Sequence, residues 1–344
     1  MAQINKPSEY FNTKLYTGNG STQSITGVGF QPDWVWIKER DDTSNHNLYD
    51  SVRGVENYIY SNETTAELSG TNSLTAFDSD GFSVGSGTFI NQSGQGYVSW
   101  NWLADNTSGS SNTDGSITST VSANTTNGFS IVRYTATGSA TNFGHGLGTA
   151  PSVVIIKDIN GTTGSGWLVG HAAIGMTNYL KLNTTAQSVS STAVFSQNAS
   201  SSLVYIGNSA AVSESGKDYI AYCFAEKKGF SKIGSYVGNG NADGTFIYTG
   251  FKPSFIMIKR TDTTGDWLMK DNKRPTVQNP VTSLLYPNTS GAEATGVNDA
   301  DFLSNGYKIR TTGTAENASG GTYIYMAFAE SPIVSSNGVP ATAR

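Results

Sequence analysis

A threefold internal repeat constrains the fold of this 344-residue chain more than any other feature. Each copy has an apolar segment that follows a proline and ends in a lysine, and a closing apolar segment further along the chain. The lysine-ended segments are 34–38, 153–157 and 255–259, and the closing segments are 97–102, 219–224 and 323–328. Because the same elements recur in the same order, we expect one structural unit built three times.

The closing segments alternate between two kinds of side chain, as β-strands with different faces do. Val98, Trp100 and Trp102 share one face, which is apolar in all three copies and which we expect to line a core. The opposite face is smaller and partly polar, and we expect it to meet a loop or a neighbour. The lysine-ended segments are apolar on both faces, which favours a central strand covered on both sides.

The composition also favours strands and turns over helices. The chain has 39 glycines and 17 tyrosines, and only 14% of its residues are charged. Asp80-Gly81 in the first copy and Asn305-Gly306 in the third indicate tight hairpins, whereas the second copy is degenerate there, near 203–206. The predicted fold is all-β, with three tandem antiparallel β-sandwich domains of jelly-roll or lectin-like type.

The repeat also predicts the domain limits. These are 1–105 for repeat one, 106–114 for a linker, 115–228 for repeat two, 229–334 for repeat three and 335–344 for a C-terminal tail. The linker is rich in Ser, Asn, Gly and Thr, so we expect it to be flexible and to leave repeat one free to be oriented separately. Repeats two and three are joined only by 227–229, so they should be held close. Residues 115–121 are expected to add a strand to repeat two.

Charge and cysteine content exclude several classes of protein. The net charge of -5 argues against binding to a phosphate backbone, which requires clustered Lys and Arg. A single cysteine excludes an intrachain disulfide and any multi-cysteine metal site. No segment resembles a signal peptide or an apolar membrane span, so we expect a chain made soluble in a cytoplasm.

Residues that could carry chemistry are few, and each has a structural interpretation. His46, His145 and His171 are interpreted as packing, loop or surface residues, and Cys223 as a buried, inert thiol on a strand. The segment 78–81 could suggest a calcium loop, but its counterpart 303–306 keeps the turn and loses both carboxylates. We therefore assign no catalytic, cofactor-binding or metal-binding residue, expect no cofactor, and predict that the chain is not an enzyme.

Two tryptophans are the remaining candidates for binding. Trp167-Leu168 and Trp267-Leu268 are aligned with each other and with Asn47-Leu48 of repeat one. Indole faces can stack on sugar rings, so carbohydrate binding is one interpretation. The favoured interpretation is that each tryptophan covers an edge of its sandwich, which leaves the residues of any glycan-binding site unassigned.

Several of these motifs together resemble a known family. The resemblance lies in residues 27–33, 115–134, 144–148, 219–226, 320–330 and 331–344. As a set they are similar to a repeat domain of tailed bacteriophages, commonly phages of marine hosts, whose members are described as virion structural, tail-fibre-like or lectin-like. The resemblance covers essentially the whole chain and carries no catalytic residues.

The resemblance implies a non-enzymatic virion structural protein. We expect it on the particle surface, associated with the tail or its fibres, where it would contribute to host attachment and could bind glycan. The alternative is a capsid decoration or head-spike protein with a purely structural role. Expected partners are other tail or capsid proteins, host surface polysaccharide and further copies of the chain, but not nucleic acid.

Overall fold

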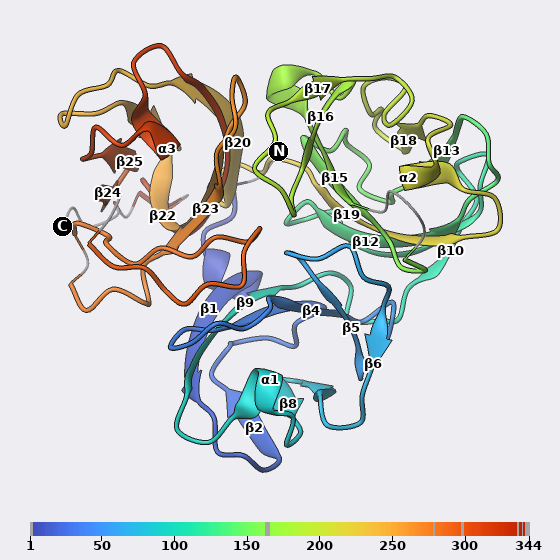
Figure 1. The fold of residues 1–344 in the computed structure, drawn as a ribbon, viewed down its shortest axis with the longest axis horizontal. Coiled ribbons are helices and arrows are strands. Elements are labelled where there is room, and N and C mark those ends of the chain that lie inside the picture. The colour runs from blue at the N-terminus through green and yellow to red at the C-terminus, as the bar shows by residue number, and fades with distance from the viewer. Residues whose placement is uncertain are drawn as a thin grey trace.

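The structure is a computed structural model that describes residues 3–161, 166–277, 279–296, 299–335, 337, 338 and 340. The fold is all-β, with antiparallel sheets and only short helical turns. Part of the predicted C-terminal tail, residues 336, 339 and 341–344, lies outside the described residues. Figure 1 shows three lobes around a common centre, one for each repeat.

Most elements of the three repeats correspond in order, and their bounds are as follows. Repeat one has 3-10 helix η1 (Pro7–Glu9), strands β1 (Phe11–Thr17), β2 (Gln23–Thr26), β3 (Trp34–Glu39), β4 (Asn47–Asp50), β5 (Asn57–Tyr60), β6 (Leu68–Ser69), β7 (Leu74–Asp78), β8 (Gly81–Val84) and β9 (Gly96–Trp102), and helix α1 (Thr88–Asn91). The segment between repeats one and two contains β10 (Ser110–Asn112). Repeat two has β11 (Ser119–Asn124), β12 (Phe129–Thr135), β13 (Thr141–Gly144), β14 (Val153–Asp158), β15 (Trp167–His171), 3-10 helix η2 (Ala172–Ile174), β16 (Asn178–Lys181), β17 (Val189–Ser190), β18 (Leu203–Ile206), helix α2 (Ala210–Ser213) and β19 (Asp218–Phe224). Repeat three has β20 (Ser231–Val237), β21 (Phe246–Tyr248), β22 (Phe251–Arg260), β23 (Trp267–Asp271), β24 (Ala300–Leu303), β25 (Gly306–Ile309), helix α3 (Thr314–Asn317) and β26 (Thr322–Pro332).

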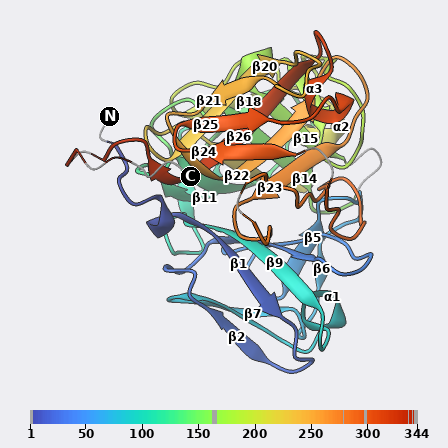
Figure 2. The ribbon, with the colours of Figure 1, turned by 90° about the vertical axis from the view of Figure 1, so that its left-hand side faces the viewer.

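Each repeat has one larger and one smaller sheet. The larger sheets contain the same run of four strands: β1-β9-β3-β4, β12-β19-β14-β15 and β20-β26-β22-β23. The smaller sheets are β2-β8-β7, β13-β18 and β21-β25-β24, and the last of these faces the viewer in Figure 2. The register also repeats, because Lys38, Lys157 and Lys259 lie opposite Val98, Ile220 and Ile324 on the closing strands. The three lysine-ended strands are therefore equivalent, as the sequence predicts.

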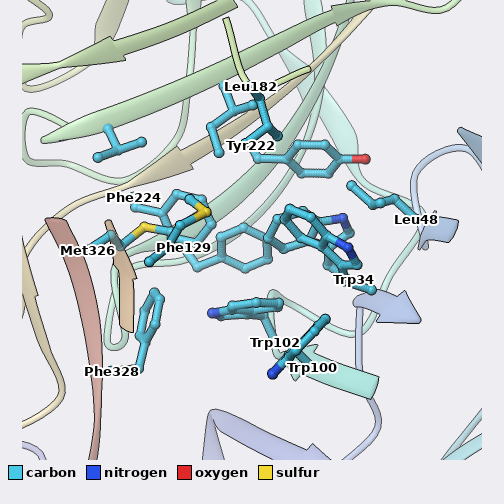
Figure 3. Packing of buried hydrophobic residues seen from close by; sticks show 14 of the residues in the cluster. Trp34, Leu48, Trp100, Trp102, Phe129, Leu182, Tyr222, Phe224, Met326 and Phe328 are labelled. Atoms are coloured by element: carbon cyan, nitrogen blue, oxygen red, sulfur yellow. The ribbon is translucent and has the colours of Figure 1, made fainter. Parts of the chain in front are cut away.

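Two kinds of core hold the molecule together. In each repeat a core lies between the larger and the smaller sheet, and in repeat one it includes Val35 and Tyr97 of the larger sheet with Phe82 of the smaller one. A further core lies between the three larger sheets and contains residues from all three repeats (Figure 3). The apolar face of each closing strand, represented by Trp100 and Trp102, points into this shared core.

This arrangement corrects one expectation about the faces of the closing strand. The smaller, partly polar face does not meet a loop or a neighbour; it packs on the small sheet of its own repeat. The aromatic face is the one that meets the neighbouring repeats. Sequence alternation separates the two faces correctly. Because both faces are buried, the alternation does not show which part of the molecule covers which face.

The segment predicted as a flexible linker is ordered, so that expectation is wrong. Ser110–Asn112 forms β10, which pairs antiparallel with β11. The Asn106 N–H donates to the Asp33 carboxylate at 3.0 Å, and the Gly109 N–H donates to the Thr107 hydroxyl at 3.0 Å. Short polar side chains here cap turns and fix the backbone instead of leaving it free. β11 supplies the expected additional strand, at Ser119–Asn124 and slightly later than 115–121.

Backbone hydrogen bonds close the three repeats into a ring. The Glu67 N–H donates to the Ile159 carbonyl at 2.9 Å, from repeat one to repeat two. At equivalent places, the Ser188 N–H donates to the Thr261 carbonyl at 3.0 Å, and the Glu293 N–H donates to the Arg40 carbonyl at 2.8 Å. The same bond therefore occurs at all three junctions, and repeat one is not oriented separately.

The three equivalent lysines, Lys38, Lys157 and Lys259, lie beside these junctions. The Lys157 ammonium donates to the Asp158 carbonyl at 2.7 Å and to the Thr64 carbonyl of repeat one at 3.2 Å. Lys259 likewise donates to the Thr185 carbonyl of repeat two at 3.3 Å. Burial lowers the pKa of Lys38, Lys157 and Lys259 to about 8. Lys157 and Lys259 therefore join one repeat to the next, whereas Lys38 donates to the Glu39 and Asp42 carbonyls of its own repeat.

Candidate functional site

The three histidines are all buried in the structure. His145 lies in a loop, where its Nδ1 accepts the Leu147 N–H at 3.2 Å and its Nε2 lies 3.2 Å from the Ser200 carbonyl. Burial lowers the pKa of His145. This ring therefore holds two turns of repeat two together and stays neutral near neutral pH.

His46 and His171 lie in the interior between repeats. His46 Nδ1 accepts the Trp36 indole N–H at 2.9 Å, and burial lowers the pKa of His46 well below its ordinary value. His171 Nδ1 accepts the Ala173 N–H at 3.1 Å, and its Nε2 lies 3.3 Å from the Tyr325 carbonyl of repeat three. Burial lowers the pKa of His171 to about 4. Both rings are placed as neutral packing groups.

Cys223 lies within β19 and is fully buried. Burial raises the pKa of its thiol to about 12, so the thiol remains protonated at neutral pH. Since the thiolate is the reactive form of cysteine, this position does not provide a nucleophile. Asn101 and Ala327 occupy the equivalent register positions in the other repeats, as the sequence predicts.

The carboxylates of the 78–81 segment hold a turn. Asp80 accepts the Gly29 N–H at 2.7 Å and the Gly27 N–H at 3.0 Å, and these hydrogen bonds lower the pKa of Asp80. Asp78 accepts the Ser83 hydroxyl at 2.7 Å. Within the part of the chain that the structure describes, no three His, Cys, Asp or Glu side chains are grouped as metal ligands would be.

The indole rings of Trp167 and Trp267 are not available to a sugar. Both are buried, and each indole N–H donates to a backbone carbonyl of the preceding repeat, at Tyr60 (2.8 Å) and Lys181 (2.9 Å). The interpretation of these tryptophans as stacking platforms is therefore wrong. Each one belongs to the junction between two repeats.

The alignment of these tryptophans also needs a correction of one residue. Leu48 lies opposite Trp36, and the equivalent strand positions Ile155 and Met257 lie opposite Val169 and Met269. His46, and not Asn47, therefore occupies the position of the two indoles. Because the loops differ in length, the sequence alone allows the two indoles to be aligned with either His46 or Asn47. The strand register allows only His46.

A different pair of aromatic side chains is exposed. Phe246 and Tyr248 lie on β21, an edge strand of its sheet, with 42% and 59% of their surfaces exposed. Ile247 between them points into the core of repeat three. Val237, at the end of β20, is 56% exposed, and its carbonyl accepts the Thr245 hydroxyl at 2.8 Å. These three side chains, Val237, Phe246 and Tyr248, form what we name the β21 surface.

The other two repeats lack this surface. Register on the partner strands aligns Phe246 and Tyr248 with Ser24 and Thr26 of β2, and with Asn142 and Gly144 of β13. The fold therefore does not require aromatic residues at these positions. In the sequence these residues form a Phe-Ile-Tyr segment close to glycines. Such a segment looks the same as a buried strand unless its position at the edge of the sheet is known.

Charged side chains surround the β21 surface. Lys308 pairs with Asp243 at 2.8 Å, and Arg310 pairs with Asp301 at 2.6 Å. The hydrogen bond from Lys308 lowers the pKa of Asp243. The Phe246 ring lies across Gly306, where a Cβ would be only 2.7 Å from ring atoms. Exposed aromatic faces with a polar rim are suited to stacking on sugar rings or to contact with another protein.

Comparisons with known proteins give one family and no function. A family model described as a domain of unknown function (DUF7483) matches residues 6–332. No curated protein and no solved structure matches the chain. Among the described residues, no helix has the length and apolar character needed to cross a bilayer.

Proposed function

The chain belongs to the DUF7483 family, and we propose that it is a non-enzymatic structural protein of a bacteriophage particle. In this proposal it is displayed on the particle surface, associated with the tail or its fibres, and contributes to host attachment. The resemblance of the repeat motifs to phage virion proteins supports this assignment. So does the position of every histidine and of the one cysteine in packing roles.

We further propose that each pair of sheets is one sandwich domain, with the limits 1–105, 115–228 and 229–334. The shared core and the ring of junction hydrogen bonds would make the three domains one rigid body. A rigid body suits attachment, because little conformational entropy is lost when its surface meets a partner. Many copies on one particle would strengthen a weak individual contact.

The β21 surface is the observation that carries the attachment proposal. Its aromatic side chains are exposed in one repeat and replaced by polar or small residues in the other two. Exposed apolar residues grouped on one surface typically mark an interaction site. Because its rim carries charges of both signs, the class of partner we propose is a host surface polysaccharide, contacted by stacking and by polar groups.

A glycan array and labelling of intact virions together test this proposal. Antibody to the chain, detected by immunogold, should label the tail or fibres, and the purified chain should bind glycans on the array. Changing Phe246→Ser and Tyr248→Thr, which copies repeat one, should abolish binding, whereas Val189→Ser on the exposed surface of repeat two should not. An absence of label on the virion would contradict the assignment to the particle.

A capsid decoration or head-spike role is the second candidate. The ring of three repeats favours it, because the larger sheets face inward onto a shared core. Label spread over the head, with no glycan bound on the array, would support this role. Label at the tail with glycan binding would favour attachment.

A further inference from the structure

The three junctions of the ring are not chemically alike. Thr13 lies opposite Trp100, and the equivalent positions in the other repeats are Ile131, opposite Tyr222, and Ile233. Both isoleucines belong to the shared core. The junction between repeats one and three therefore has a hydroxyl where the others have a branched apolar side chain.

A second position at the same junction is also polar. Lys273 follows Asp271 by two residues, and the register aligns it with Val52 of repeat one and Ala173 of repeat two. Val52 packs against the shared core, whereas Lys273 is exposed. Two positions of the ring are thus polar at one junction and apolar at the other two.

A polar pocket of about 250 Å³ lies where these substitutions meet. Its lining includes Asn12 and Thr13 of repeat one, and Asn272, Lys273 and Glu330 of repeat three. An adjoining hollow of about 410 Å³ continues along β1 past Lys14 and shares Asn12, Thr13 and Lys273 with the pocket. Together they form one groove, which we name the β1 groove.

Two side chains of the β1 groove have polar atoms without a partner. Thr13 is 7% exposed and Asn272 is 8% exposed. Thr13 Oγ1 and Asn272 Oδ1 find no hydrogen-bond partner among the residues that the structure describes. Buried polar atoms are normally hydrogen-bonded, so two such atoms in the lining of one pocket indicate a missing partner.

The remaining charges of the groove indicate the chemistry of that partner. Glu330 is already paired with Lys252 at 2.7 Å, so its negative charge is balanced. The other charged side chains in the lining are Lys14 and Lys273, which are both positive. A partner with hydroxyl groups for Thr13 and Asn272 and a carboxylate for Lys273 would complete these interactions.

We propose that the β1 groove binds a carboxylated sugar. Its hydroxyl groups hydrogen-bond Thr13 and Asn272, and its carboxylate pairs with Lys273. This inference goes beyond the attachment proposal, because the groove shares no residue with the β21 surface. The two sites can therefore fail or succeed independently.

Ligand-observed NMR on the full chain tests the groove. The probes are glucuronate, galacturonate, mannuronate and N-acetylneuraminate, with glucose, galactose and acetate for comparison. At least one acidic sugar should bind, the neutral sugars should bind more weakly by about tenfold or more, and acetate should not compete at the same concentration. No binding by any acidic sugar would overturn the proposal and leave a pocket that holds only water.

Matched variants identify the site. Thr13→Ile should abolish binding yet fold, since Ile131 and Ile233 already occupy the equivalent positions, and Lys273→Val should weaken binding by about tenfold or more. The pair Phe246→Ser and Tyr248→Thr should leave binding unchanged. Acidic-sugar binding that survives Thr13→Ile, or equal binding of neutral and acidic sugars, would overturn the assignment. The assignment would also be overturned if the wild-type chain bound no sugar and Thr13→Ile only raised the melting temperature.

Discussion

The indole of Trp34 stacks on the ring of Tyr222 across the junction of repeats one and two, with ring centroids 4.3 Å apart and planes 21° from parallel. The two residues are far apart in the sequence, and both are fully buried. Similar contacts join repeat one to repeat three, where the rings of Phe11 and Phe328 are 5.1 Å apart. The repeats therefore share the aromatic residues that stabilise them.

Trp34→Ala should destabilise the whole molecule, and not repeat one alone. Loss of a large buried aromatic side chain costs about 3–5 kcal/mol of unfolding free energy, because a cavity remains. Urea denaturation should show one transition at lower urea concentration, as seen by fluorescence and by circular dichroism. Val55→Ala, at an exposed position of the same repeat, is the control and should change little. Two separate transitions in the variant would contradict a shared core.

In the core of repeat three a buried ionic cluster occupies positions that are apolar in repeat one. Lys270 pairs with Glu316 at 2.9 Å, and the Tyr307 hydroxyl donates to Glu316 at 2.7 Å. In repeat one, Ile90 and Phe82 take the places of Glu316 and Tyr307. Glu316→Ile alone should cost about 3–5 kcal/mol, because it leaves a buried charge unpaired.

The matched triple variant should recover most of that loss. Combining Glu316→Ile with Lys270→Met and Tyr307→Phe removes the charges and the hydroxyl together, which is often nearly neutral for stability. The four chains, including wild type and Lys270→Met, are compared by chemical denaturation. A triple variant less stable than Glu316→Ile would show that the cluster contributes more than its charges cost to bury.

Acid should weaken the fold through His171. Burial lowers its pKa to about 4, whereas an unfolded histidine titrates near 6.5. The unfolded state therefore takes up a proton first, and the unfolding free energy falls as the pH drops from about 6.5 to 4, by up to about 3 kcal/mol. His171→Gln should show a shallower dependence over the same window. A His171 ring signal that titrates near 6.5 in NMR spectra would contradict this expectation.

Alkali should act in the opposite direction through Lys157. Its pKa is lowered to about 8 by burial, so the folded state releases a proton before the unfolded state does. Between about pH 8 and 10.5 the wild-type chain should gain up to about 3 kcal/mol relative to Lys157→Met, because the unfolded state still holds the proton that the folded state has released. Below pH 8 the difference should be constant. Lys228→Met, at an exposed position, should give no such trend.

The sequence predicts the repeated elements better than their assembly. The strands that contain Lys38, Lys157 and Lys259 and the alignment of the three closing strands agree with the structure. These depend on local alternation and on order along the chain. The shared core depends on contacts such as Trp34 with Tyr222, between residues that no local pattern connects.

The candidate sites were harder to predict for the same reason. Trp167 is as apolar in sequence as Phe246, yet the first is covered by repeat one and the second lies on an open edge. The sequence does not distinguish Thr13 from other strand residues. Only the register shows that it is the polar counterpart of Ile131 and Ile233. In both places the exposure of a side chain and the polarity of its surroundings depend on how the repeats pack against one another.

Hydrogen exchange at the three junction amides tests the ring most directly. The N–H groups of Glu67, Ser188 and Glu293 each donate to the next repeat. If the repeats fold as one body, these amides should exchange with similar free energies, close to that of global unfolding. Rapid exchange at Glu67 with protection retained at Ser188 would contradict the account, because repeat one would then separate while the other two remain folded.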